Sequence, residues 1–93
     1  MIKTFADLHT AELYEVGKAK RFPSDIWGVA LRRLQYFDSA SCVNDLRVPP
    51  RNRLHKLRKD REGQYSIYVN IKWRIGFRFN DGDVYDVELT DYY

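Results

Sequence analysis

The spacing of the hydrophobic residues changes near the middle of the chain. Before residue 46 they recur at helical spacing, whereas from residue 54 onward they alternate with polar residues. The first pattern is typical of amphipathic helices, and the second is typical of strands with one covered face. Because helices come first and strands follow in series, the sequence predicts an α+β fold. We expect two or three N-terminal helices packed on one face of a twisted, mostly antiparallel sheet.

Capping residues mark where the helices are expected to begin and end. Residues 1–5 precede the helices and predict a short first strand. Asp7 can cap a first helix, and Gly17 can end that helix in a left-handed conformation. Ser24 is the expected cap of the main helix, which closes over residues 38–40.

The main helix carries an apolar stripe that predicts how it packs. Ile26, Ala30, Leu34 and Phe37 recur at helical spacing, so this stripe is expected to cover one face of the sheet. The opposite side of the helix is expected to face away from the sheet. The side chains assigned to that outer side are Arg32, Arg33 and Gln35.

Alternation with a period of two predicts four strands in the second half of the chain. One short helical turn over residues 43–46 precedes them, and Pro49 and Pro50 are expected to stop any helix and extend the chain. Asn80-Asp81-Gly82 is a strong hairpin signal. The expected strands cover residues 54–57, 65–70, 72–79 and 84–89, with a polar turn over residues 59–63.

The length and composition predict one domain with an aromatic core. The chain has 93 residues, which fits a single domain over residues 1–93. Cys42 is the only cysteine, so no intramolecular disulfide can form, and we expect a small buried thiol. No apolar run is long enough for a signal core or a membrane span, and the composition suits the cytoplasm. The expected core includes Trp27, Phe37, Trp73, Phe77 and Phe79, with Tyr85, Val87 and Leu89 on one side of the last strand.

The net charge of +3 is mild, but the charges are unevenly distributed. A basic stretch covers residues 47–61, whereas residues 81–91 contain five acidic residues and no Lys or Arg. Such a stretch either contacts a polyanion or is a solvated loop, and charge alone leaves both readings open. The alternation in residues 72–79 sends Lys72, Arg74 and Arg78 to the face away from the core. His55 and Arg58 can converge on that same face.

Several segments in this order resemble one known family. Residues 53–67 are similar to its central block, and residues 72–85 are similar to the hairpin that follows. The ending Asp91-Tyr92-Tyr93 resembles its C-terminal signature, and residues 1–5 also fit. Together they resemble the HigB toxins of the RelE/ParE superfamily across nearly the whole chain.

That resemblance implies both a fold and an activity. It implies helices packed on one face of a twisted antiparallel sheet, and an endoribonuclease that cuts translated mRNA in the A site of the 70S ribosome. We expect no cofactor, no metal ion and no membrane partner. The implied partners are the ribosome, mRNA and a HigA-type helix-turn-helix antitoxin, and DNA is reached only through that antitoxin.

Residue roles follow from the resemblance only where the residues match. His55 matches the family's active-site histidine, Arg74 its basic residue, and Asp91 and Tyr92 the start of the terminal signature. The chain departs from the pattern at Arg58, where the family has lysine, and at Tyr93, where it has histidine. The expected catalytic residues are therefore His55, Arg58, Arg74, Asp91, Tyr92 and Tyr93. The expected RNA- or ribosome-binding residues are Arg51, Arg53, Lys56, Lys59, Arg61, Lys72 and Arg78.

These residue types suit metal-independent RNA cleavage. The 2′-hydroxyl of RNA can attack the adjacent phosphate if a base removes its proton, donors stabilise the phosphorane and an acid protonates the leaving oxygen. A guanidinium group matches two phosphate oxygens, and a histidine can serve as acid or base. Tyr93 either transfers a proton or stacks on a base, and Tyr92 is an equally good stacking residue.

Other readings remain open from the sequence. One is a catalytically weak or inactive homologue that binds its antitoxin and represses their shared promoter. Another is an inhibitor of the ParE type, which binds a topoisomerase. His55 can also be structural, simply satisfying a backbone group, and Tyr92 and Tyr93 can be a frayed tail.

Overall fold

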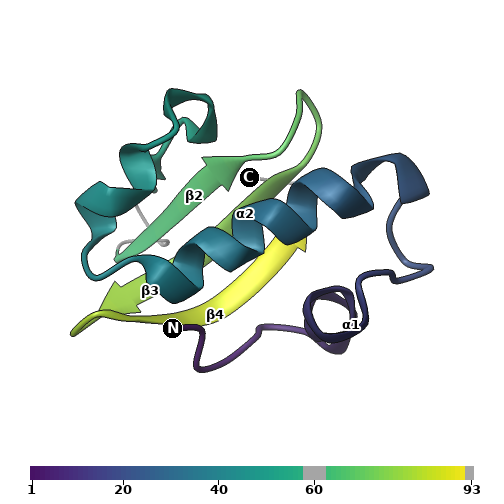
Figure 1. Cartoon of the computed structure of the whole chain (residues 1–93), viewed down its shortest axis with the longest axis horizontal. Helices are drawn as coiled ribbons and strands as arrows, with labels where there is room; N and C mark the ends of the chain where they lie inside the picture. The colour runs from purple at the N-terminus through teal and green to yellow at the C-terminus, as the bar shows by residue number, and fades with distance from the viewer. Residues whose placement is uncertain (58–62, 92–93) are drawn as a thin grey trace.

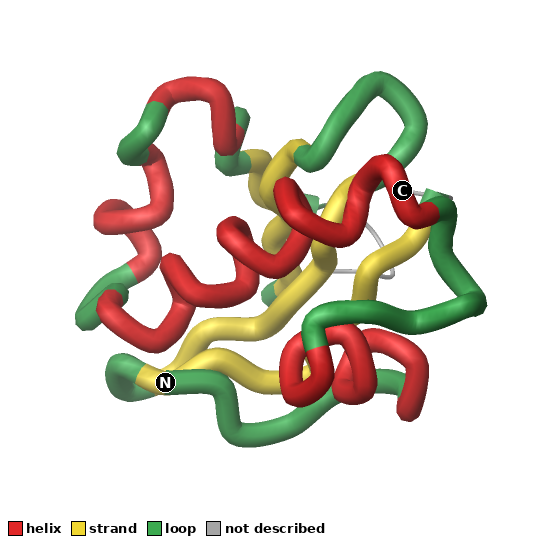
Figure 2. Tube along the Cα trace, turned by 45° about the vertical axis from the view of Figure 1, so that its right-hand side comes forward, coloured by secondary structure: helices red, strands yellow, loops and turns green. Residues whose placement is uncertain are grey.

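The computed structural model describes residues 1–57 and 63–91. Two helices cover one face of a four-stranded sheet, and the longer helix lies over the strands and runs in roughly their direction (Figure 1). Figure 2 shows that the helices stay on one side of the sheet, so the other face is not covered by either helix. The predicted α+β architecture is therefore confirmed.

The elements follow the predicted order, with short 3-10 turns between them. The helices are α1 (Leu8–Val16) and α2 (Trp27–Ser39). The 3-10 turns are η1 (Ser24–Ile26), η2 (Val43–Arg47) and η3 (Pro50–Asn52). The strands are β1 (His55–Lys56), β2 (Gln64–Tyr68), β3 (Arg74–Asn80) and β4 (Asp83–Thr90).

The sheet is antiparallel, and its order follows the sequence from β1 to β4. Asn80 pairs with Asp83, so the two residues between them form the predicted tight turn. Both turn residues have positive φ, at 50° for Asp81 and 82° for Gly82, as a hairpin turn matching the twist of its strands requires. The polar turn expected at residues 59–63 lies mostly outside the described residues.

A β-bulge in β4 changes the expected alternation. Gly76 pairs with Glu88 and Arg78 pairs with Tyr85, so β4 has one residue more than β3 over this interval. Asp86, with a φ of 54°, lies within that interval. The bulge brings both Val84 and Val87 into the core, whereas Tyr85 is only partly buried. The prediction that Tyr85 and Val87 share a face is wrong.

The N-terminal segment pairs with the free edge of β4 rather than forming a complete strand. It makes two isolated parallel bridges, from Ile2 to Val84 and from Phe5 to Val87. Between these bridges, the Thr4 hydroxyl accepts a hydrogen bond from the Asp86 amide at 2.9 Å. The first segment therefore covers an edge that would otherwise leave its backbone groups unpaired.

The ends of α1 are those that the sequence predicts. The Asp7 carboxylate accepts a hydrogen bond from the Thr10 amide at 2.7 Å, and Gly17 ends the helix with a φ of 90°. The prediction of a Ser24 cap is wrong, because Ser24 begins η1 and the start of α2 has no side-chain cap. Pro50 does not stop helical structure either. It occupies the first turn of η3, where a missing amide hydrogen costs nothing.

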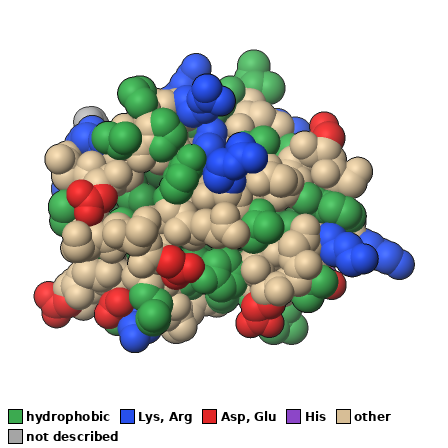
Figure 3. Space-filling view, viewed as in Figure 1, with side chains coloured by type: hydrophobic (Ala, Val, Ile, Leu, Met, Phe, Trp, Pro, Cys, Tyr) green, Lys and Arg blue, Asp and Glu red, His purple; other side chains and the backbone are tan. Residues whose placement is uncertain are grey.

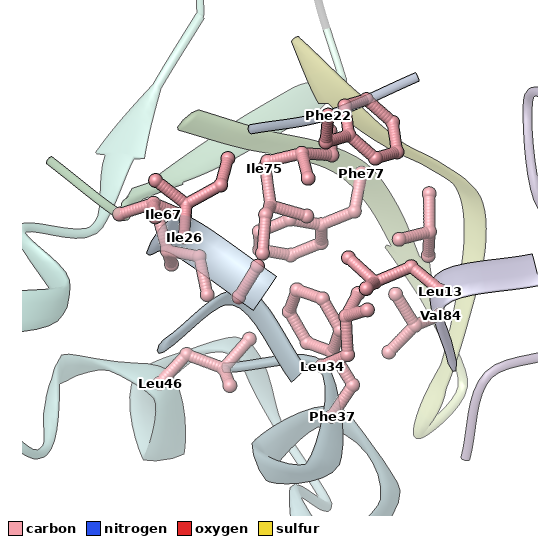
Figure 4. Close-up of a cluster of buried hydrophobic side chains, with 14 of the residues drawn as sticks. Leu13, Phe22, Ile26, Leu34, Phe37, Leu46, Ile67, Ile75, Phe77 and Val84 are labelled. Carbon is pink, nitrogen blue, oxygen red and sulfur yellow. The ribbon is translucent and has the colours of Figure 1, made fainter. Parts of the chain in front are cut away.

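The core lies between α2 and the helix-facing side of the sheet (Figure 4). Phe37 on α2 and Phe77 on β3 are fully buried, with ring centres 4.7 Å apart. Trp27, Trp73 and Phe79, which the sequence also assigns to the core, are partly buried at its border. The other labelled side chains of Figure 4 pack around the Phe37–Phe77 pair.

Two single-residue expectations are corrected. Arg33 is buried rather than facing away, because its Nε donates to the backbone carbonyl oxygen of Tyr68 at 3.2 Å. Cys42 is exposed rather than buried, since it occupies the N-cap position of η2 on the surface. Nearby, backbone and hydroxyl hydrogen bonds from Ser41 hold the pKa of Asp45 below its usual value.

Within residues 1–57 and 63–91, no helix has the length and apolarity needed to cross a membrane.

Candidate active site on the open face of the sheet

The strand register aligns two rows of residues across the sheet. Ser66 lies opposite both His55 and Gly76, and Gly76 lies opposite Glu88. Two residues away along each strand, Tyr68 lies opposite Arg74, and Arg74 lies opposite Thr90. Because the residues between these rows, such as Ile67 and Ile75, point into the core, the rows themselves belong to the open face.

Small residues leave a hollow on the part of this face that β1, β2 and β3 form. The hollow has a volume of about 360 Å³ and is lined by Arg53, His55, Leu57, Ser66 and Arg74. Ser66 is almost fully buried at its base, and the neighbouring position on β3 is Gly76, which has no side chain. Two guanidinium groups and an imidazole therefore surround a recess large enough for a small anionic group.

His55 and Arg74 both border this hollow, a convergence that the alternation permits. His55 is exposed on β1, and Arg74 is partly buried at the start of β3. Arg58, predicted to join them, lies outside the described residues, as do Tyr92 and Tyr93. The described part of the site combines a side chain able to transfer protons with cations able to bind phosphate.

Arg53 reaches the hollow through an uncommon backbone conformation. Its φ is 47° and its ψ is 55°, in the left-handed region that residues other than glycine seldom adopt. The preceding Asn52 is fully buried, and its amide nitrogen donates to the carbonyl oxygens of Leu46 at 3.0 Å and Val48 at 3.4 Å. Asn52 therefore anchors the turns that carry Arg53 to the edge of the sheet.

Tyr68, to which the sequence analysis assigned no functional role, contacts both arginines of the hollow through its ring. The guanidinium carbon of Arg53 lies 4.3 Å from the centre of the Tyr68 ring, and that of Arg74 lies 5.3 Å from it. Tyr68 alternates with the core residue Ile67 on β2, and this alternation was a signal that it shares the face of Arg74.

Asp91 lies away from the hollow. Its carboxylate is 3.9 Å from the Lys72 ammonium group, in an exposed pair at the end of the sheet. It also lines a separate recess of about 430 Å³ together with Asp7, Arg21 and Trp73. Among the described contacts, Asp91 makes none with His55 or Arg74.

The other predicted RNA-binding residues are dispersed. Arg51 is exposed on η3, and Lys56 points to the opposite side of β1, where it lines a different recess with Arg47. Arg78 lies further along β3 and is paired with Asp86 at 3.4 Å. Lys59 and Arg61 lie outside the described residues. Figure 3, which views the helix side, shows basic side chains more often in its upper part and acidic ones more often in its lower part.

The described part of the chain has no cluster of side chains suited to binding a metal ion. Within residues 1–57 and 63–91, no group of three or more His, Cys, Asp or Glu side chains is arranged to hold a metal ion. The chemistry that this part of the site offers consists of cations and proton transfer.

Comparison with known families identifies the chain. The profile of a family described as "RelE-like toxin of type II toxin-antitoxin system HigB" matches residues 3–93. The chain belongs to this family. A HigB-family chain pairs with an antitoxin, as members of type II toxin–antitoxin systems do.

Two relatives match most or all of this HigB-family chain. A protein of Proteus vulgaris named "Endoribonuclease HigB" is 37% identical over 93 residues, which is 100% of both chains. A protein of Vibrio cholerae named "Toxin HigB-1" is 37% identical over 83 residues, covering 88% of this chain and 87% of the other. The family resemblance of the sequence is thereby confirmed.

A solved structure supports the fold independently. A histidine-to-glutamine mutant of YafQ from E. coli superimposes with a TM-score of 0.58 and covers 99% of this chain and 94% of its own. The two sequences are 14% identical, so this likeness concerns the fold alone.

Proposed function

We propose that this HigB-family toxin is an endoribonuclease that cuts translated mRNA in the A site of the ribosome. It acts in the cytoplasm and is neutralised by a HigA-type helix-turn-helix antitoxin, through which it reaches promoter DNA indirectly. The observation that carries this proposal is the hollow on the open face, where Arg53, His55 and Arg74 converge. The name of the Proteus vulgaris relative, which matches over its whole length, supports the same activity.

The proposed reaction uses the RNA's own nucleophile. A base removes the 2′-hydroxyl proton, and the 2′-oxygen attacks the adjacent phosphorus. The bond from phosphorus to the 5′-oxygen then breaks, and an acid protonates that oxygen. The products are a 2′,3′-cyclic phosphate and a 5′-hydroxyl end. No atom changes oxidation state, so the reaction requires no redox partner. Side chains can supply both the proton transfers and the stabilisation of the phosphorane, so it requires no metal ion.

The residues of the hollow suit the parts of this reaction. The guanidinium groups of Arg74 and Arg53 would bind the phosphate and stabilise the negative charge that develops on it. His55 would transfer a proton at one of the two oxygens. The shared position supports these roles, because both cations and the imidazole border a single recess.

Residues outside the hollow complete the proposal from the sequence. Arg58 would add a further cation, and Tyr92 and Tyr93 would stack on the RNA or take part in proton transfer. Asp91 would act from the end of β4, where it is paired with Lys72. Arg51, Lys56, Lys59, Arg61, Lys72 and Arg78 would contact RNA or the ribosome through their charge.

Mapping transcript ends after induction in cells tests the proposal. A ribosome-dependent nuclease should produce new ends in phase with codons, and only on messages that are being translated. The same messages with a mutated start codon serve as the control, because they are transcribed but not translated. New ends on untranslated messages would contradict ribosome dependence, and growth arrest without new ends would contradict the nuclease itself.

A further inference from the structure

We propose that Tyr68 is a positioning residue for RNA cleavage, and that its ring holds Arg53 and Arg74 together as a paired clamp for one phosphodiester group. This inference rests on the proposed nuclease function and adds to it a residue that does not itself react.

The Tyr68 ring contacts two cations from different elements. Arg53 comes from the end of η3 and lies 4.3 Å from the ring centre, and Arg74 comes from the start of β3 and lies 5.3 Å from it. Both distances are within the reach of a cation–π contact, about 6 Å. Tyr68 also lies directly opposite Arg74 in the register of the sheet. One aromatic ring therefore links the two arginines that border the hollow.

The backbone of Tyr68 is held from the helix side of the sheet. The buried side chain of Arg33 on α2 donates its Nε hydrogen to the Tyr68 carbonyl oxygen at 3.2 Å. The next residue, Val69, donates its amide to the Trp73 carbonyl oxygen at 3.0 Å, which closes the turn into β3. With its backbone fixed in this way, Tyr68 presents its ring at a defined place beside Arg74.

Two guanidinium groups that approach one site repel each other before the RNA arrives. An aromatic ring offsets part of that repulsion, because its face attracts each cation without neutralising it. A carboxylate in the same place would bind the arginines more strongly but would compete with the phosphate. A tyrosine ring therefore orders both cations and leaves their hydrogen-bond donors available for an anion.

The test measures single-turnover cleavage of mRNA on programmed ribosomes, with the maximal rate and the half-saturating toxin concentration determined separately. Tyr68→Leu removes the ring and should lower the maximal rate by about tenfold or more. Tyr68→Phe keeps the ring and should stay within about twofold of the parent. Because the clamp acts on the reacting phosphate, the maximal rate should change more than the half-saturating concentration.

A double-mutant cycle separates positioning from a general structural effect. If Tyr68 acts through Arg53, the rate losses of Tyr68→Leu and Arg53→Ala should combine less than multiplicatively. The matched control is Tyr65→Leu, which removes a ring from the same strand but on the side that stacks on Phe77 in the core. This control should leave the maximal rate unchanged and combine multiplicatively with Arg53→Ala.

The outcomes distinguish the inference from the function on which it rests. If Arg74→Ala still cuts at the parental rate, the proposed active site is wrong. If Arg74→Ala loses cleavage but Tyr68→Leu does not, only the role of Tyr68 is wrong. A large loss in Tyr68→Phe would make the hydroxyl a reacting group and overturn positioning. If Tyr68→Leu does not fold, Tyr68→Met tests the same loss of the ring, and parental cleavage by that variant would overturn the inference.

Discussion

The hydroxyl group of Tyr14 on α1 donates a hydrogen bond to the carboxylate of Asp38 near the end of α2. The same Asp38 carboxylate accepts a hydrogen bond from the Ile2 amide at 3.2 Å. The pair therefore joins both helices to the N-terminal segment that covers the edge of β4. The hydrogen bond to Asp38, together with burial and the negative charge of Asp38, raises the pKa of Tyr14 from 10.0 to about 12.

This pKa predicts a loss of stability in strongly alkaline solution. The folded state holds the Tyr14 proton more tightly than the unfolded state, so the contribution is complete below pH 10.0 and is lost as pH rises through about 12. The measurement is the free energy of unfolding between these limits for the parent and for Tyr14→Phe. The difference between the two proteins should shrink as pH rises, and a constant difference would contradict the assignment.

A second prediction concerns the hydrogen bond from Arg33 to the Tyr68 carbonyl oxygen. Arg33→Met fills similar space but leaves this partly buried oxygen without its donor, so the free energy of unfolding should fall by about 1–3 kcal/mol. Urea denaturation measures the change. Arg32→Met, an exposed neighbour on the same helix, should change stability by no more than about 0.5 kcal/mol. If Arg33→Met is as stable as the parent, this hydrogen bond does not contribute to the stability of the fold.

A third prediction tests the cap of α1. Asp7 accepts hydrogen bonds from the Thr10 amide at 2.7 Å and from the Thr10 hydroxyl at 3.1 Å. Asp7→Ala should lower the free energy of unfolding by about 1 kcal/mol, whereas Asp7→Asn keeps an accepting oxygen and should lose less. Thermal or chemical unfolding of the two variants gives the comparison. Equal losses would show that the charge of Asp7, rather than its capping oxygen, is what stabilises the helix.

The features that were predicted correctly from the sequence depend on residues that are adjacent along the chain. The Asp7 cap, the Gly17 end of α1 and the turn at Asp81 and Gly82 each follow from a few adjacent positions. The bulge at Asp86 does not, because its amide is satisfied by the Thr4 hydroxyl, which comes from the opposite end of the chain. Alternation alone assumes a regular strand, so it could not locate the extra residue.

The candidate site also contains some residues whose place a sequence pattern indicates and others whose place it does not. Alternation along neighbouring strands allowed His55 to share the face of Arg74, and both residues line the hollow. The place of Arg53 depends on a left-handed backbone at a residue other than glycine, which no sequence pattern indicates. Arg33 was expected on the side of the helix opposite the apolar stripe, but its side chain is long enough to reach the carbonyl oxygen of Tyr68.

A fourth prediction tests the two residues that the alternation brought together. Arg74→Ala and His55→Ala should relieve growth inhibition on induction, because each removes a group from the hollow without opening the core. Loss of the Arg74 cation should slow cleavage by about 100-fold or more. Arg32→Ala, on the helix side, is the matched control and should remain toxic. Retention of antitoxin binding would show that the variants are folded, and full toxicity of both folded variants would exclude this site.

The last prediction concerns Tyr93, where the chain departs from the terminal histidine that its family resemblance leads us to expect. Tyr93 lies outside the described residues, so the prediction rests on chemistry alone. If Tyr93 supplies a proton, Tyr93→Phe should slow cleavage by roughly two to four orders of magnitude, because the hydroxyl is lost. If it stacks on the RNA, Tyr93→Phe should be nearly neutral and Tyr93→Ala should lose about 1–3 kcal/mol of binding.

We favour stacking, because a free phenol titrates near ~10 and is a poor proton donor or acceptor at neutral pH, whereas histidine is a good one. Single-turnover cleavage on programmed ribosomes distinguishes the two roles, and antitoxin affinity measured in parallel controls for folding. Tyr93→His should raise the cleavage rate if the tyrosine has weakened the toxin. A Tyr93→Phe variant that binds antitoxin normally but no longer cuts would make Tyr93 a proton-transfer group, and His55 would then share that role rather than perform it alone.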